Sequence, residues 1–266
     1  MATTDPDGSA LIERLLDAQR PDGQWGVGVY DGDEWESTTD ALWILHELGA
    51  DPSDDRVRRA VDLVDEHVRW EPGTGGRRFF DGETEACVNG RVLTLGATLG
   101  RPSAGLAERL LGEQLEDGGW NCEAPPSLRS SFHPTICVLE GLLEFERVSG
   151  PDAAIGEARR RGEEYLLERG LLRRRSDGAV IDDGWRVIHV PAYWCYDLLR
   201  ALDHLRASGR EPDPRAGEAV EAIREARRPD GTWAAEAHAG RPLIDLGPVA
   251  DRIATTRARR VLEWAG

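Results

Sequence analysis

The sequence predicts an all-α fold built from about five helical hairpins that follow one another along the chain. A seven-residue pattern, Gln-x-x-Asp-Gly-x-Trp, recurs about once per 50 residues, and a fixed period of this size indicates a repeat architecture. Between the copies, apolar residues recur at helical spacing, as Leu42, Leu45 and Leu48 do. Almost no segment alternates between polar and apolar residues for long enough to form a strand.

The repeated turn has two complete copies, at residues 19–25 and 114–120. A third copy, at 227–233, lacks the glutamine, and two degenerate copies lie at 70–79 and 176–180. In each repeat the Asp-Gly pair is expected to end a helix, because glycine readily adopts the left-handed conformation that closes one.

Each repeat therefore predicts an outer helix, a turn and an inner helix. The outer helices are expected at residues 8–20, 54–70, 103–116, 155–172 and 214–228. The inner helices, which are richer in apolar and small residues, are expected at 37–49, 84–99, 132–147, 191–208 and 250–264. Ser53, Ser103 and Asp213 precede outer helices and are suited to cap them. Together the repeats predict a single domain over residues 1–266.

The charge of the chain excludes some classes of partner. The net charge of its 266 residues is −16, and all 33 basic residues are arginine. Such an acidic surface argues against nucleic acid and anionic membranes as partners. No apolar run reaches the ~18 residues that span a bilayer. The N-terminus has no signal-peptide pattern, so we expect a cytoplasmic protein with reduced cysteines.

The repeated turn resembles the QW motif of squalene-hopene cyclases and related terpenoid cyclases, and the β subunits of protein prenyltransferases share a similar repeat. Residues 117–122 and 132–142 are especially similar to the prenyltransferase pattern, and residues 255–262 resemble the last inner helix of bacterial stand-alone repeat proteins. The resemblance covers nearly the whole chain. It implies an α/α toroid, in which two concentric rings of helices enclose a cavity. An open helical solenoid is the alternative.

The resemblance also implies a zinc site. Protein prenyltransferases hold zinc with a carboxylate-x-Cys pair and a later histidine, which Glu85, Cys87 and His133 resemble here. Cys122 would be an additional thiolate, because loops and inner-helix starts converge on one mouth of a toroid. The sequence departs from the pattern in one respect, since Pro134 falls where the family has its histidine. The alternative is that the cysteines are small buried core residues.

Other residues near the starts of inner helices are candidates for catalysis and substrate binding. Asp40, Tyr193 and Asp197 are the candidate catalytic residues, and Tyr193 and Asp197 would share a helix face because they are four residues apart. The candidate substrate-binding residues are aromatic or can bind anions: Trp35, Trp43, Phe132, His189 and Arg257. The alternatives are helix capping for the acids, core packing for the aromatic residues and surface exposure for the arginine.

The leading hypothesis for function is a small zinc-dependent enzyme of the prenyltransferase and terpenoid-cyclase type. It would act on an apolar, isoprenoid substrate in the central cavity. One alternative is a metal-free cyclase or isomerase, although the Asp-x-Asp-Asp acid of class II cyclisation is absent from the chain. Another is a non-catalytic repeat protein that binds a lipid or protein partner. A protein prenyltransferase would also need a second subunit.

Overall fold

The computed structural model describes residues 6–30, 36–70, 76–237 and 243–266. Its α-helices, in chain order, are α1 (Pro6–Asp17), α2 (Thr38–Glu47), α3 (Asp55–His67), α4 (Ala86–Thr98), α5 (Ala104–Gly112), α6 (Phe132–Ser149), α7 (Ala153–Leu167), α8 (Leu198–Ala207), α9 (Gly217–Glu225) and α10 (Pro248–Ala265). Three short 3-10 helices accompany them: η2 (Phe79–Asp81), η3 (Asp183–Arg186) and η4 (Pro214–Ala216). The described residues form isolated β-bridges but no β-strand, so the all-α prediction is confirmed.

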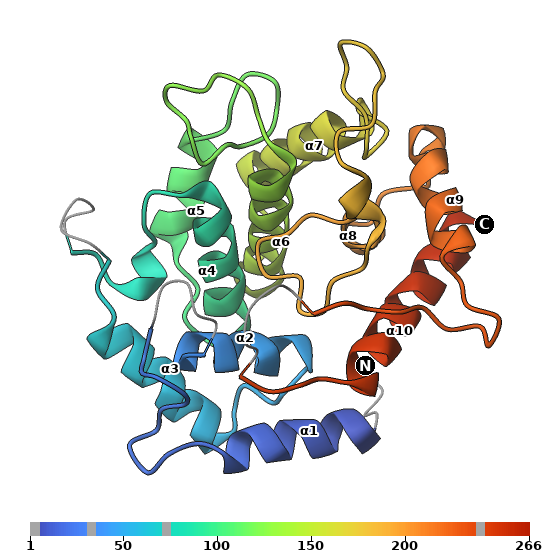
Figure 1. Ribbon diagram of the computed structural model, residues 1–266. Helices are drawn as coiled ribbons and strands as arrows, with labels where there is room; N and C mark the ends of the chain where they lie inside the picture. The colour runs from blue at the N-terminus through green and yellow to red at the C-terminus, as the bar shows by residue number, and fades with distance from the viewer. Residues whose placement is uncertain (1–5, 31–35, 71–75, 238–242) are drawn as a thin grey trace.

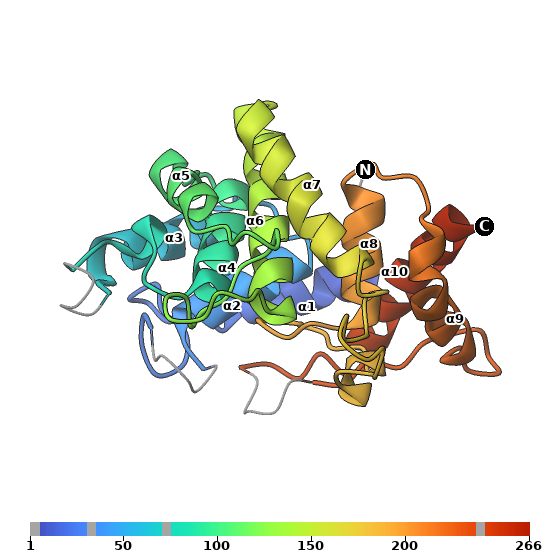
Figure 2. The same ribbon diagram turned by 90° about the horizontal axis from the view of Figure 1, so that it is seen from above.

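The helices form two concentric rings, as the sequence predicted (Figure 1). The inner ring consists of α2, α4, α6, α8 and α10, and the outer ring of α1, α3, α5, α7 and α9. Figure 2 shows that the loops leading into the inner helices gather on one side of the ring. None of the described helices combines the length and the apolar character needed to cross a membrane.

The tryptophan of each well-preserved turn ties its hairpin together by the same two hydrogen bonds. The indole Nε1–H of Trp25, Trp120 and Trp233 donates to a carbonyl ten residues earlier, at 2.6–2.7 Å. The backbone N–H of each tryptophan donates to a threonine Oγ1 in the following inner helix, at 2.9–3.1 Å. All three indoles are buried, so the turn is a packing device that repeats with the hairpin.

The glutamine of each complete turn links neighbouring hairpins. The Gln114 side-chain amide donates to Gly118 O in its own turn and to Ala158 O in α7, at 2.7 and 2.8 Å. Gln19 makes the equivalent pair of bonds, the second of them to Arg56 O in α3. Each complete turn therefore fixes the next outer helix as well as its own.

Two glycines bring α4 and α6 into direct backbone contact. A Cβ added at Gly90 would lie 2.3 Å from the Cys137 carbonyl carbon, and one added at Gly141 would lie 2.5 Å from Gly90 O. No other residue type fits such an approach. The two inner helices that carry the candidate metal ligands are consequently held close together.

Ion pairs inside the ring join helices that lie far apart in sequence. Arg257 of α10 pairs with Glu47 of α2 at 2.5 Å, and this contact closes the ring. Glu163 of α7 is almost fully buried and accepts hydrogen bonds from Arg210 at 2.6 Å and His204 at 3.1 Å. Burial raises the pKa of Glu163, but these hydrogen bonds outweigh burial and leave that pKa below its ordinary value.

The fourth inner helix begins later than predicted. The expected helix over 191–208 starts at Leu198, because the Asp197 carboxylate caps α8 by accepting the Arg200 N–H at 2.8 Å. Tyr193 has a φ of +46°, which a helix does not allow. Tyr193 therefore lies in a loop, and the prediction that Tyr193 and Asp197 share a helix face is wrong.

Candidate functional site

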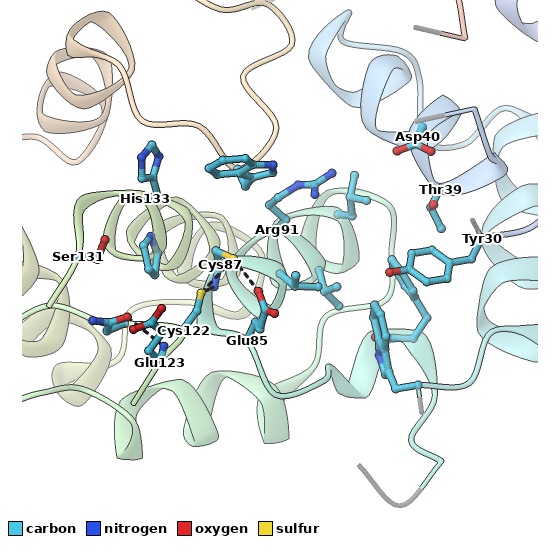
Figure 3. A pocket seen from close by; sticks show the side chains of 18 residues that line it. Tyr30, Thr39, Asp40, Glu85, Cys87, Arg91, Cys122, Glu123, Ser131 and His133 are labelled. Atoms are coloured by element: carbon cyan, nitrogen blue, oxygen red, sulfur yellow. Dashed lines mark hydrogen bonds between the residues drawn. The ribbon is translucent and has the colours of Figure 1, made fainter. Parts of the chain in front are cut away.

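A cavity of about 560 Å³ opens where the inner helices begin. It is lined by the first turns of α2, α4 and α6 and by the loops beside them (Figure 3). Its lining combines aromatic, aliphatic and polar side chains. The lining residues are Tyr30, Thr39, Asp40, Trp70, Phe79, Glu85, Cys87, Val88, Arg91, Val92, Leu95, Asn121, Cys122, Glu123, Ser131, His133, Pro134 and Trp194. Cavities of this composition are typical small-molecule sites.

Three rings form an aromatic wall on one side of this cavity. Trp70 stacks on Phe79 with ring centroids 5.3 Å apart, and Tyr30 meets Trp70 edge to face, also at 5.3 Å. The Trp70 Nε1–H donates to Phe79 O, which fixes the indole against η2. Trp70 and Phe79 come from the degenerate turn at 70–79, and all three rings line the cavity.

Glu85, Cys87 and Cys122 meet on the opposite side of the cavity. Glu85 and Cys87 stand at the start of α4, whereas Cys122 comes from the loop between α5 and α6 (Figure 3). The two sulfurs lie 3.1 Å apart, and Cys87 Sγ lies 3.7 Å from Glu85 Oε2. The sequence therefore identified a real cluster, since these three donor atoms all lie within 4.8 Å of one another.

The two thiols of the cluster differ in acidity. Their mutual hydrogen bond lowers the pKa of Cys122, and the Cys87 backbone N–H, which donates to Cys122 Sγ at 3.4 Å, adds to the effect. The same thiol–thiol hydrogen bond raises the pKa of Cys87, and burial raises it further. Of the two thiols, Cys122 is therefore the more acidic.

The donor set of this cluster fits zinc. Zinc binds thiolate sulfur and carboxylate oxygen, and a catalytic site uses three protein ligands with a fourth position open. In a tetrahedral zinc site two thiolates lie about 3.7 Å apart, so the sulfurs would need to separate by only roughly 0.6 Å. Small side-chain rotations at Cys87 and Cys122 supply this change, because both residues are only half-buried.

His133 lines the same cavity but lies outside the cluster (Figure 3). Its Nδ1 accepts the backbone N–H of Tyr196 at 2.9 Å, and burial, aided by the charge of Arg200, lowers its pKa. A neutral imidazole whose Nδ1 accepts carries its proton on Nε2. In this arrangement His133 is a hydrogen-bond donor, and the structure does not bring it to the sulfurs as the predicted ligand.

Sequence comparison finds no match to this chain among protein-family profiles or curated proteins. Structural comparison finds two structures of the type II terpene cyclase MstE from Scytonema, one without a ligand and one in complex with its substrate, geranylgeranyl dihydroxybenzoate. In both cases the TM-score is 0.53, the identity is 19%, and the alignment covers 99% of this chain and 83% of the other. The fold is an α/α toroid similar to that of MstE. The predicted resemblance is thus confirmed at the level of the fold.

Asp40 and Arg91 are two further charged residues that line the cavity. Asp40, in the first turn of α2, accepts hydrogen bonds from the Ser37 N–H and hydroxyl at 3.1 and 2.7 Å. The Arg91 guanidinium lies 4.9 Å from the ring centre of Trp43 and 5.4 Å from that of Tyr193. Arg91 is the one arginine among the described residues of the lining, and the sequence analysis missed it. The available signal was that Arg91 is the one charged residue in the apolar segment 86–99.

The remaining candidates lie away from this cavity. Trp43 and Arg257 line a separate, strongly polar cavity of about 340 Å³ at the C-terminal ends of the inner helices. Asp197 is buried as the cap of α8 and also accepts the His189 N–H at 3.3 Å. Phe132 packs between Tyr165 and Trp185 rather than facing the cavity, and Trp35 lies outside the described residues.

Proposed function

We propose that this protein is an enzyme that converts an apolar isoprenoid substrate in the 560 Å³ cavity, and that Glu85, Cys87 and Cys122 hold a catalytic zinc ion there. The observation that carries the proposal is the position of the aromatic wall opposite the two-sulfur cluster in one cavity. An isoprenoid chain against Trp70 and Phe79 would have its reacting carbons facing the cluster. Zinc, when bound, supplies Lewis acidity.

The side chains around the cluster have separate tasks in this proposal. Trp70 and Phe79 bind the chain of the substrate, and their ring faces stabilise positive charge that develops on it. His133 donates a hydrogen bond through Nε2 to a polar group of the substrate. Asp40, whose carboxylate is held by Ser37, provides a fixed negative charge on the α2 side of the cavity.

The charge of the lining favours a particular substrate class. A diphosphate group needs two or more arginines, because each guanidinium pairs with only part of its charge. Among the described residues, Arg91 is the one arginine that lines the cavity. The proposed substrate is therefore an isoprenoid that carries at most one acidic group. Geranylgeranyl dihydroxybenzoate, the substrate of MstE, is a compound of that kind.

A metal-free cyclase or isomerase is the second candidate. It is favoured by the similarity of the fold to that of MstE and by the carboxyl groups of Asp40, Glu85 and Glu123, which line the cavity. In that case a carboxylic acid would protonate the substrate and the cysteines would only pack.

Metal analysis and substrate conversion together test both candidates. We expect about one zinc per chain in the purified protein, and loss of most of it in Cys122→Ser. Cys195→Ser is the matched control, since Cys195 lies outside the cavity lining and the cluster. Conversion of polyprenyl alcohols and prenylated aromatic acids is followed by mass spectrometry, with and without chelator.

Three outcomes decide between the candidates. Turnover that is lost with chelator and restored by zinc supports the zinc enzyme. Turnover that persists in metal-free protein contradicts the zinc site and supports the second candidate. If no isoprenoid is bound or converted by zinc-loaded protein, the enzyme proposal fails.

A further inference from the structure

A second pocket, of about 610 Å³, lies on the other side of the first turn of α6 and does not belong to the cavity described above. Four arginines line it, at positions 129, 169, 174 and 175, together with only one acidic residue, Asp117. In a chain whose net charge is −16, such a concentration of arginine is unusual. The pocket therefore differs in charge from the surface around it.

The pocket occurs where the repeated turn is degenerate. In the fourth repeat, Arg174 stands at the glutamine position and Val180 at the tryptophan position. The packing that tryptophan provides elsewhere comes here from Tyr196, whose hydroxyl donates to Leu171 O at 2.7 Å. This turn does not pack around a tryptophan, so side chains such as that of Arg174 can serve another role.

Aromatic rings form the floor of the pocket. Phe132 lies between Tyr165 and Trp185, with ring centroids 5.5 and 4.6 Å apart. The Trp185 indole N–H is buried and has no acceptor among the described residues. A ligand with an apolar body would cover these rings, and an oxygen that reaches the indole would satisfy a donor that is otherwise costly to bury.

The arginines are arranged above this floor. The Arg169 guanidinium lies 3.8 Å from the Tyr165 ring centre and donates to Tyr165 O at 2.8 Å, so its position is fixed. The Asp117 carboxylate accepts from both the N–H and the hydroxyl of Ser130, and it also lies 3.8 Å from the Arg169 guanidinium. Arg174 and Arg175 pair with Asp177 and Glu168, at 3.7 and 2.7 Å. Arg129 is the one lining arginine that has no carboxylate within 4.0 Å in the described part of the chain.

The start of α6 adds to the positive potential. Ser131, the N-cap residue, lines the pocket, and its hydroxyl makes no capping hydrogen bond. The positive end of an 18-residue helix dipole favours an anion at this point. Guanidinium groups complement oxyanions by paired N–H donors.

We propose that this pocket binds a small organic oxyanion, namely a carboxylate or phosphate joined to an apolar body. The oxyanion pairs with the arginines, above all Arg129 and Arg169, while the apolar body covers Phe132 and Trp185. This proposal is independent of the enzymatic one, because it requires no metal and because Ser131 is the one residue that lines both pockets.

Calorimetric titration of the intact protein tests this site. The probes are phenyl phosphate, benzoate, inorganic phosphate and phenol. We expect phenyl phosphate or benzoate to bind at one site, and the stronger of the two identifies the oxyanion. Phenol and inorganic phosphate should each bind at least about tenfold more weakly, since each lacks one half of the recognised structure.

A matched pair of variants locates the site. Arg129→Gln should weaken binding about tenfold, because it removes the arginine whose charge has no local partner. Arg173→Gln is the control, since Arg173 is adjacent in sequence to the lining residues Arg174 and Arg175 but pairs with Glu218 and does not line the pocket. It should change the affinity by less than about twofold. Equal effects of the two substitutions, no saturable binding of either aromatic anion, or equal binding of inorganic phosphate would overturn the proposal.

Discussion

The contact between α4 and α6 provides a strict test of the packing described above. Gly141→Ala adds one methyl group where the nearest atom is Gly90 O, 2.5 Å from the new Cβ, with Gly90 C and Leu93 Cβ at 3.2 Å. Ordinary contacts of this kind are 3.4–4 Å long. The two helices must therefore separate by a large fraction of an ångström, and backbone atoms cannot rotate away as a side chain would.

The expected magnitude combines two opposing effects. Alanine is a better helix former than glycine by about 1 kcal/mol in a helix interior. Overpacking by one methyl group costs typically about 1–3 kcal/mol, and more where the backbone itself must move. We expect Gly141→Ala to lower the free energy of unfolding by about 1–3 kcal/mol, because here the steric cost exceeds the propensity gain.

The assay is urea-induced unfolding at pH 7, followed by tryptophan fluorescence. The matched control is Gly105→Ala in α5, an exposed helical glycine with no atom within 4 Å of the added Cβ. The control should raise the free energy of unfolding by about 0.5–1 kcal/mol, since only the propensity term remains. If both variants are stabilised to the same extent, the close contact between α4 and α6 does not exist and the reasoning is refuted.

Three further predictions concern stability, each measured by the same urea titration. Glu163→Gln should cost about 3 kcal/mol at pH 7. Because the pKa of Glu163 is lower in the folded state, its carboxylate stabilises the protein at pH values above the unfolded-state pKa, and this stabilisation is lost as the pH falls through the folded-state pKa. The unfolding free energies of the variant and the parent should therefore converge in acid. A difference that stays constant with pH would contradict this. Trp120→Phe should cost about 1–3 kcal/mol, because the indole hydrogen bond to a buried carbonyl is lost, and a neutral effect would contradict the packing role of the turn. Arg257→Met should cost about 3 kcal/mol by leaving Glu47 buried without its partner, and Arg257→Met combined with Glu47→Gln should recover most of that loss.

The fold was predictable from sequence because its defining contacts are local. Each turn tryptophan bonds to a carbonyl ten residues earlier and to a threonine 13 to 22 residues later. Such contacts repeat with the motif, and the motif is therefore visible without any knowledge of the tertiary structure. The positive φ of Gly23, Gly118 and Gly231 has the same local origin.

The cavity was predictable only in part. Cys87 and Cys122 were expected together because both lie at the mouth where loops and inner-helix starts converge, and their sulfurs do meet. The direction of each side chain around its helix was not predictable. Phe132 and His133 are consecutive, so they point about 100° apart, and only His133 faces the cavity. The aromatic wall was missed because the copy of the turn at 70–79 is degenerate, so the motif did not indicate where Trp70 and Phe79 would lie.

The start of α8 shows a different limit of sequence reasoning. Apolar residues continue through 191–196, and their spacing resembles that of the helix that follows. The structure ends this similarity at Asp197, whose carboxylate satisfies a free N–H of α8. The sequence does show a possible capping residue, Asp197, after Pro191. Whether the helix starts at this cap or earlier in the apolar segment depends on tertiary contacts such as those of Tyr196, which the sequence does not show.

The ring-closing contact between Glu47 and Arg257 has a consequence for how the protein is made. The two residues are 210 positions apart, so closing this loop in a flexible chain would cost roughly 5 kcal/mol of conformational entropy. During synthesis, at about 5–20 residues per second, α2 exists for many seconds before α10 has left the ribosome. Until then the first hairpin can pack only on the second, and its other flank is exposed to solvent. The nascent chain is therefore an open arc whose first hairpin exposes a flank, and this flank is covered only when α10 has been synthesised.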